Sequence, residues 1–168
     1  MDTTKRYKAV FFDLGGTLRI ALLEEPWMRH ARRKMAEIAG SPVPYEEFYQ
    51  MIEERYEPYR KWALGENKES NDEELWCKWL LPDYDQARIK QVCHELSFQY
   101  RQCKGRRVVV DGGAEVIKGL HDRGYKLGII SNLIGENEVP DWLEEDGLAQ
   151  YFDTVILSSA CGLHKPCS

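Results

Sequence analysis

The stretch that decides the fold is Val10-Phe11-Phe12-Asp13-Leu14-Gly15-Gly16-Thr17-Leu18. Its apolar first part has the length and composition of a buried β-strand, and the paired glycines that follow predict a tight turn. Asp13 stands where that strand ends. In an open parallel sheet, ligands bind beyond the carboxyl ends of the strands, so this carboxylate is expected to face a ligand crevice. The alternative is that Asp13 only caps a turn.

Two further apolar runs, residues 125–130 and 152–157, end at Ser131-Asn132 and Ser158-Ser159 and predict two more buried strands. Helical signals lie before and between them. Residues 116–120 have helical spacing and are closed by Gly124, and Pro140 suits the first turn of a second helix. Alternation of strand and helix is typical of a parallel sheet with crossover helices, so an α/β fold is expected.

The middle of the chain differs. From about residue 24 to residue 104 the apolar residues recur only with helical spacing, which predicts four amphipathic helices. Ser70 and Glu73 are expected to form a capping box at the third of them. We therefore predict a Rossmann-like three-layer core built from residues 1–20 and 105–168, with an inserted all-helical subdomain at residues 21–104.

Composition narrows the class of protein. The chain carries a net charge of −5 and its short basic clusters, such as Arg106-Arg107, are interpreted as solvent-exposed surface, so no nucleic-acid partner is expected. No apolar stretch suits a membrane span or a signal peptide. Five scattered cysteines favour a reducing cytoplasm. Cys161, His164 and Cys167 lie three apart but offer only three of the four ligands of a structural zinc site, so their spacing is interpreted as incidental.

Three chemical groups follow the three predicted strands. They are the Asp13 carboxylate, the Ser131 hydroxyl with its neighbour Asn132, and the Lys165 ammonium within Gly162-Leu163-His164-Lys165-Pro166. A lysine beside a nucleophilic carboxylate and a phosphoryl group would neutralise charges that otherwise repel each other. The order of these groups predicts one pocket that binds a tetrahedral anion.

These residues carry a family resemblance. Residues 10–18 resemble the first motif of the haloacid dehalogenase superfamily, Ile129-Ile130-Ser131-Asn132 the second, and Gly162 to Pro166 the third. The helical insertion has the position of that superfamily's helical cap. The resemblance implies a Rossmann-like core under a mobile cap, and Mg²⁺-dependent phosphoryl transfer through an aspartyl-phosphate.

The resemblance also implies a role for each matching residue. Asp13 would be the nucleophile, Thr17 would support the loop, Ser131 would bind phosphoryl oxygens, Asn132 would position the group, and Lys165 would balance charge. Substrate binding would involve Leu14, Gly15, Gly16, Ser131 and Asn132. The Asp13 carboxylate and the backbone carbonyl of Gly15 would hold Mg²⁺.

Two features depart from the superfamily pattern. Phosphatase members carry a second aspartate two residues after the nucleophile, where this chain has Gly15, and glycine has no proton to give. The superfamily's fourth motif, an acidic pair that completes the metal site, is absent before the last residue, Ser168. We expect a C-terminally incomplete core, and its unprotected sheet edge leaves a homodimer as an open alternative.

Three functions follow from these features. The leading interpretation is a phosphatase-type hydrolase acting on a small phosphorylated metabolite. Because of Gly15, a non-catalytic phosphate-binding or regulatory protein is a second hypothesis. A 2-haloacid dehalogenase or a phosphonatase is a third, since members with those activities also lack the acid at this position. A phosphonatase would need a lysine in the helical insertion, and nothing selects among Lys34, Lys61 and Lys68.

Overall fold

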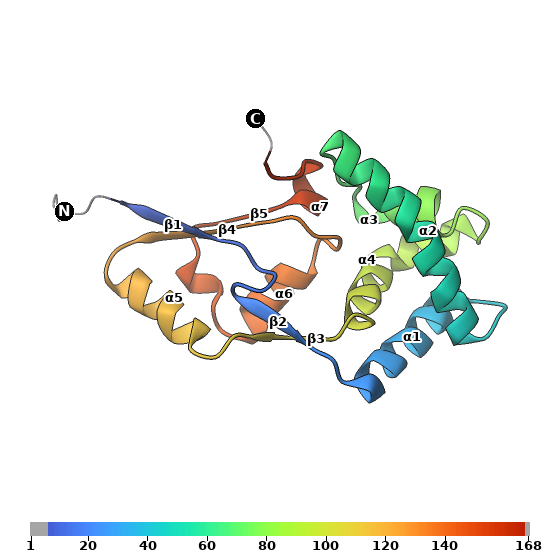
Figure 1. The fold of residues 1–168 in the computed structure, drawn as a ribbon, viewed down its shortest axis with the longest axis horizontal. Coiled ribbons are helices and arrows are strands. Elements are labelled where there is room, and N and C mark those ends of the chain that lie inside the picture. The colour runs from blue at the N-terminus through green and yellow to red at the C-terminus, as the bar shows by residue number, and fades with distance from the viewer. Residues whose placement is uncertain (1–6, 167–168) are drawn as a thin grey trace.

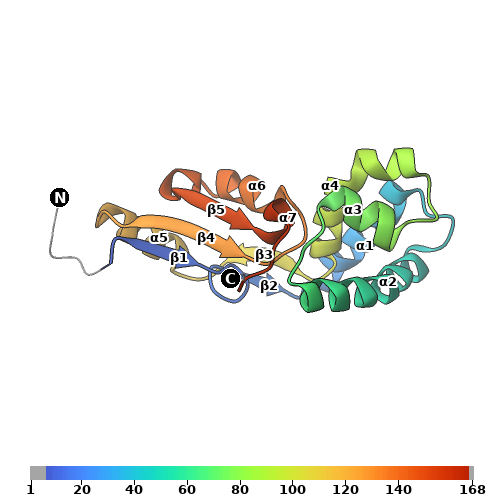
Figure 2. The same ribbon diagram turned by 90° about the horizontal axis from the view of Figure 1, so that it is seen from above.

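The computed structural model describes residues 7–166. Figures 1 and 2 show two parts side by side: an α/β part, formed by both ends of the chain, and a helical part formed by the middle. The helical part comprises α1 to α4, and two strands, β2 and β3, lead into and out of it (Figure 1). This arrangement agrees with the predicted α/β fold that carries a helical insertion.

A three-stranded parallel sheet forms the centre of the α/β part. Its strands are β1 (Ala9–Phe12), β4 (Lys126–Ser131) and β5 (Thr154–Leu157), in the order β1-β4-β5. Phe12 pairs with Ile129, and Ser131 pairs with Leu157. The strands therefore point the same way, and Asp13 and Ser131 reach the same edge of the sheet.

Helices α5 (Gly113–Asp122) and α6 (Glu138–Glu145) pack on one face of this sheet, below it in Figure 1. They share a hydrophobic core with the strand residues that point to that face, which include Leu127 and Ile129. On the opposite face Phe11 and Ile156 remain 54% and 43% exposed. The second helical layer of the predicted three-layer core is not found among residues 7–166.

A two-stranded antiparallel ribbon joins the two parts and was not predicted. It consists of β2 (Arg19–Leu22) and β3 (Arg106–Val109). Arg106 and Arg107 were expected on solvent-exposed surface, but both lie in β3 and are only partly exposed. Arg106 donates two hydrogen bonds to the Glu24 carboxylate, at 2.8 and 2.9 Å. The β-branched residues Val108 and Val109 favour the strand. Strand β2 crosses the boundary predicted between residues 20 and 21.

The helical part contains α1 (Glu25–Ala39), α2 (Tyr45–Glu66), the short α3 (Asp72–Glu74) and α4 (Gln86–Gln102). A π-helical segment, η1 (Leu75–Leu80), continues α3. These elements bury their own hydrophobic core, separate from that of the sheet. Large aromatic side chains such as Trp76 and Phe48 fill much of it, as helical spacing predicted.

The predicted capping box is wrong by one residue. Asn71, not Ser70, caps α3, and its side-chain oxygen accepts a hydrogen bond of 2.8 Å from the Glu74 backbone N–H. The backbone N–H of Ser70 instead donates to the Tyr59 hydroxyl at 3.1 Å. Because this contact engages the Ser70 backbone, the helix cap lies one residue later than predicted, at Asn71.

The two parts also contact each other through backbone hydrogen bonds near the C-terminal end of the described chain. Glu69 N–H donates to Gly162 O at 3.0 Å, and His164 N–H donates to Asn67 O at 2.9 Å. Two short helices, η2 (Ala149–Tyr151) and α7 (Ser158–Cys161), flank β5. None of the helices within residues 7–166 has both the length and the apolar character needed to span a membrane.

Candidate active site

A tight turn after β1 presents Asp13. The Leu14 carbonyl accepts hydrogen bonds from the backbone N–H groups of Thr17, Leu18 and Arg19, at 3.1, 3.1 and 2.9 Å. Gly16 adopts φ 71°, in the left-handed region where a side chain would be strained. The turn therefore depends on this glycine and leaves the Asp13 carboxylate partly open to solvent, with 42% of its side chain exposed.

The structure brings the three predicted groups together. Lys165 Nζ donates to Asp13 Oδ1 at 2.5 Å, and Ser131 Oγ donates to the same oxygen at 3.2 Å. Ser131 is buried at the end of β4, whereas 40% of the Lys165 side chain is exposed. One carboxylate, one hydroxyl and one ammonium thus converge at one edge of the sheet.

The environment lowers the pKa of Asp13 below its ordinary value. Partial burial raises this pKa, because it disfavours the charged carboxylate, but the hydrogen bond and positive charge of Lys165 oppose burial. Hydrogen bonds from the Leu14 backbone and the Ser131 hydroxyl act in the same direction as Lys165. The carboxylate is consequently ionised near neutral pH, as a nucleophile must be.

Asn132 positions the segment that carries Lys165. Its Nδ2 donates to Lys165 O at 2.9 Å, and its Oδ1 accepts from Lys165 N–H at 2.8 Å. The Lys165 ammonium also donates to Ile130 O at 2.7 Å. The second and third motifs are therefore joined directly, and Asn132 contacts Asp13 only by way of Lys165.

The other predicted site residues contribute backbone groups. The Leu14 side chain is buried in the core, so only its backbone can contribute to ligand binding. Gly15 is exposed, and a Cβ atom built on it would meet nothing within 4 Å. Thr17 is exposed, and no side-chain hydrogen bond of Thr17 is found among the described residues. Its contribution to the loop in the structure is its backbone hydrogen bond to Leu14.

The oxygen atoms at Asp13 suit the magnesium ion that the family resemblance implies. Both side-chain hydrogen bonds to Asp13 within residues 7–166 end on Oδ1, which leaves Oδ2 directed elsewhere. The carbonyl of Gly15 is a second oxygen donor two residues away. Mg²⁺ is commonly bound by one or two carboxylates together with waters and substrate phosphates, so this partial donor set fits the ion.

A buried hydrogen-bonded cluster that the sequence did not reveal lies next to the Lys165 segment. His164 Nε2 lies 2.7 Å from Glu69 Oε2, and the Ser158 hydroxyl donates to the same oxygen at 3.2 Å. The Tyr59 hydroxyl donates to the other carboxylate oxygen. No local signal could pair residues 95 positions apart. His164 is therefore hydrogen-bonded to a carboxylate. Cys167, the last residue of the three-apart series Cys161, His164 and Cys167, lies outside the described residues.

A cavity of about 300 Å³ opens between the two parts of the molecule, beside Asn132 and His164. Its wall is rich in positive charge. The cationic side chains that line it are Arg60, Arg101, Lys104 and Arg107. Arg101 and Lys104 pair with the carboxylates of Glu138 and Glu53.

Arg107 differs from the other cations of this wall. Its buried Nε has no hydrogen-bond partner among the described residues. Burial lowers the pKa of Arg107, and the nearby charge of Arg101 lowers it further. A guanidinium remains charged despite such a shift, so Arg107 presents a charged, unmatched hydrogen-bond donor to this cavity.

Residues 7–168 match the model of the protein family described as haloacid dehalogenase-like hydrolase. Haloacid dehalogenase-like hydrolase domain-containing protein 3 of Bos taurus is 38% identical over 58 residues, and the Mus musculus protein of the same name gives the same identity. Each match covers 34% of this chain and 22% of the relative. The chain therefore matches about a fifth of the length of these curated relatives.

Comparison of structures extends the likeness over nearly the whole chain. A predicted phosphoglycolate phosphatase from Haemophilus somnus 129pt is similar with a TM-score of 0.50. The two share 15% sequence identity over 97% of this chain and 68% of the other. At this identity the likeness shows a common fold.

Proposed function

The chain belongs to the haloacid dehalogenase-like hydrolase family, and from that premise we propose that it hydrolyses a small phosphorylated metabolite through an aspartyl-phosphate at Asp13. The observation that carries this proposal is the convergence of Lys165 and Ser131 on Asp13 Oδ1. Nucleophilic catalysis by a carboxylate needs an ionised oxygen and a neighbouring positive charge. Both are present.

In the proposed first step, the Asp13 carboxylate attacks phosphorus as the bond from phosphorus to the ester oxygen breaks. Lys165 and the Ser131 hydroxyl lie where they would stabilise the negative phosphoryl oxygens. When bound between the Asp13 carboxylate and the Gly15 carbonyl, Mg²⁺ would supply further positive charge. In the second step water attacks the phosphoryl group, which releases inorganic phosphate and restores the carboxylate.

Gly15 determines where the protons come from. The departing alkoxide must take a proton, and the water that hydrolyses phospho-Asp13 must lose one, but Gly15 offers no group for either transfer. Solvent water supplies and accepts these protons in the proposed reaction. General acid–base help is typically worth 10²–10⁴-fold, so we expect slow turnover and an aspartyl-phosphate that persists.

The charged cavity supports an anionic substrate. It adjoins Asn132, which in turn holds Lys165 beside Asp13. Arg107 supplies a partly buried cation whose Nε has no hydrogen-bond partner among the described residues, although the Glu138 carboxylate is near enough to act on its charge. A metabolite with a carboxylate or a second phosphate, in addition to the phosphate that is cleaved, would match this cavity.

Phosphate release from a panel of phosphate esters in the presence of Mg²⁺ tests the proposal. We expect the parent chain to release phosphate slowly and the Asp13→Asn variant to lose at least about three decades of that rate, since the nucleophile is gone. Asp111→Asn, at an exposed turn, should match the parent. Mass spectrometry after acid quenching should find a phosphoryl adduct on Asp13. Equal rates for Asp13→Asn and the parent would overturn the proposal.

The same panel tests the anionic cavity. Replacing Arg107 with methionine removes one charged hydrogen-bond donor, which is worth about 1.5–3 kcal/mol, so KM should rise roughly 10- to 100-fold for metabolites that carry a second anionic group besides the phosphate that is cleaved. KM for an aryl phosphate whose aryl group bears no charge should change little. Arg123→Met, on an exposed turn after α5, is the matched control. An unchanged ratio of KM values would exclude this cavity as the substrate site.

Gly15 favours a second candidate, a 2-haloacid dehalogenase, because halide leaves without a proton. Chloride release from a 2-chlorocarboxylic acid, lost in Asp13→Asn, would support it over phosphate hydrolysis. A third outcome is tight phosphate-ester binding with neither product, which would indicate a phosphate-binding or regulatory protein. Measuring chloride and phosphate on the same preparation separates these three functions.

A further inference from the structure

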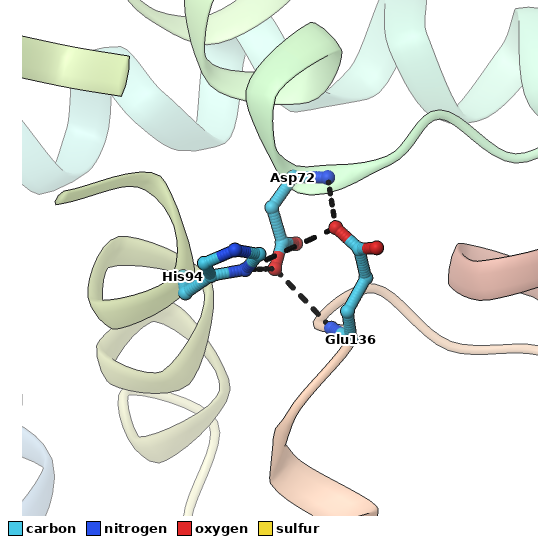
Figure 3. A group of neighbouring side chains, drawn as sticks. All are labelled: Asp72, His94 and Glu136. Atoms are coloured by element: carbon cyan, nitrogen blue, oxygen red, sulfur yellow. Dashed lines mark hydrogen bonds and ion pairs between the residues drawn. The ribbon is translucent and has the colours of Figure 1, made fainter. Parts of the chain in front are cut away.

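A second group of chemically reactive side chains lies outside the Asp13 site. Figure 3 shows Asp72, His94 and Glu136 pointing toward one another from three separate segments. His94 Nδ1 lies 2.7 Å from Asp72 Oδ2 and 3.9 Å from Glu136 Oε2. One nitrogen and two carboxylate oxygens, all within 4.8 Å of one another, can bind the same ion.

The Asp72 carboxylate is held in place by buried neighbours. Ser97 Oγ donates to Asp72 Oδ1 at 2.5 Å, and the indole N–H of Trp76 donates to Ser97 Oγ at 2.8 Å. Asp72, Ser97 and Trp76 are each at most 1% exposed. This chain of hydrogen bonds fixes one carboxylate oxygen and directs the other, Oδ2, into the cluster. Such outer hydrogen bonds are what orient carboxylate ligands in metal sites.

Glu136 is positioned by the backbone. Its Oε2 accepts a hydrogen bond of 3.1 Å from the Asp72 N–H, and its own N–H donates to Asp72 Oδ2 at 3.2 Å. These two bonds, drawn as dashed lines in Figure 3, hold both carboxylates beside His94. The ligand oxygens of the two carboxylates lie within 4.8 Å of each other, so their negative charges repel. A cation bound between them would stabilise this arrangement.

No lysine or arginine neutralises these carboxylates within residues 7–166, where the ion pairs of Asp72 and Glu136 are both with His94. We infer that the cluster is a binding site for a divalent transition-metal ion of the Zn²⁺ type. The mixed nitrogen and oxygen donors favour such an ion over Mg²⁺ or Ca²⁺, which prefer oxygen alone. The three protein ligands would leave a fourth position to water.

Binding of the ion would require little movement of the His94 ring relative to the two carboxylates. In a tetrahedral zinc site with bonds of about 2.0–2.1 Å, neighbouring ligand atoms lie about 3.3 Å apart. The spacings of 2.7 and 3.9 Å at His94 Nδ1 lie on either side of that value. The His94 side chain is 53% exposed, so the ring can shift and the ion can enter from solvent.

The site would connect the two parts of the molecule. Asp72 begins α3 and His94 lies in α4, both in the helical part, whereas Glu136 lies in the loop that connects β4 to α6. That loop begins just after Ser131, the hydroxyl that contacts Asp13. A bound ion would therefore hold the helical part against the strand end that carries the candidate active site.

Calorimetric titration of the chelator-treated chain with ZnCl₂ tests this inference without any activity measurement. We expect saturable binding of one ion, with affinity lowered at least 100-fold in His94→Gln and about 10- to 100-fold in Ser97→Ala, the range found when outer partners are removed. His121→Gln is the matched control, because His121 is similarly exposed, at 46%, and lies outside the cluster. It should bind as the parent does.

Two further variants locate the ion. Glu136→Gln should weaken Zn²⁺ binding as much as His94→Gln does if the site is correct. Glu136 is chosen over Asp72 because it is partly exposed, whereas replacing the buried Asp72 could prevent folding. Asp13→Asn should bind Zn²⁺ normally. Loss of binding in Asp13→Asn alone would place the ion at the candidate active site and overturn the inference, as would equal binding by His94→Gln and the parent or no binding by the parent at micromolar Zn²⁺.

Discussion

Asn132 and Lys165 hold each other through two hydrogen bonds, of 2.9 and 2.8 Å, although 33 positions separate them in the chain. Both bonds use the backbone of Lys165, so they place its Cα while the ammonium remains free to contact Asp13 at 2.5 Å. Asn132 therefore acts as a positioning residue.

Asn132→Ala should lower kcat about 100-fold, the cost expected when a catalytic group is misplaced by about 1 Å. KM should change less, because the phosphate-binding groups remain. Asn137→Ala is the matched control: Asn137 is exposed and has no side-chain hydrogen bond to the α6 N-terminus. A parental kcat for Asn132→Ala would contradict the positioning role.

Lys165→Met should raise the pKa of Asp13, because it removes the hydrogen bond and the positive charge that oppose the effect of burial. In the proposed reaction Asp13 acts in its ionised form. With a higher pKa, a smaller fraction of Asp13 is ionised at any acidic pH, so activity should fall at a higher pH than in the parent. The pH dependence of kcat/KM measures this shift.

At neutral pH the same variant should also lose about 10²–10³-fold in kcat/KM, the usual cost of removing one stabilising donor. Lys165→Arg retains the positive charge and should restore much of the parent's kcat/KM at acidic pH. Carbon NMR titration of the Asp13 carboxyl gives the pKa directly. An unchanged titration in Lys165→Met would show that Lys165 does not set the ionisation of Asp13.

Gly15→Asp should increase phosphatase turnover by about one to three decades, within the range of general acid–base help. The structure can accommodate the change, because a Cβ at Gly15 meets no atom within 4 Å and its backbone is outside the positive-φ region. Single-turnover kinetics should show faster decay of phospho-Asp13. Gly15→Ala adds the Cβ without the carboxyl and should match the parent; equal rates in both variants would exclude the missing acid as the limiting factor.

Glu69→Ala should lower the free energy of unfolding by about 3 kcal/mol, because removal of the buried carboxylate leaves its hydrogen-bond partners unsatisfied. Those partners are His164, Ser158 and Tyr59. Burial and the neighbouring carboxylate raise the pKa of Tyr59, so its hydroxyl keeps the proton that it donates to Glu69. Urea denaturation measures the loss.

The control for that change is Glu66→Ala, three residues earlier at the exposed end of α2, where a surface substitution should cost less than about 0.5 kcal/mol. Equal unfolding midpoints for the two variants would mean that the Glu69 pair contributes nothing to the contact between the helical and α/β parts.

The sequence alone determined the parallel sheet, the helical insertion and the groups that meet at Asp13. These features are local, because a buried strand needs an apolar run, a helix needs its spacing, and a strand end needs no distant partner to place Asp13 or Ser131. The glycine turn after Asp13 is local too, and Gly16 adopts the positive φ that such a turn requires.

Tertiary structure alone decided the rest. The ribbon of β2 and β3 depends on pairing across the whole insertion, and the Glu24–Arg106 contact spans the same distance in the chain. The pairing of Glu69 with His164 and the meeting of Asp72 with His94 and Glu136 depend on how the helical part packs against the sheet. A charged side chain carries no local mark of its partner, because burial and distance, which set the strength of a pair, exist only once the chain has folded.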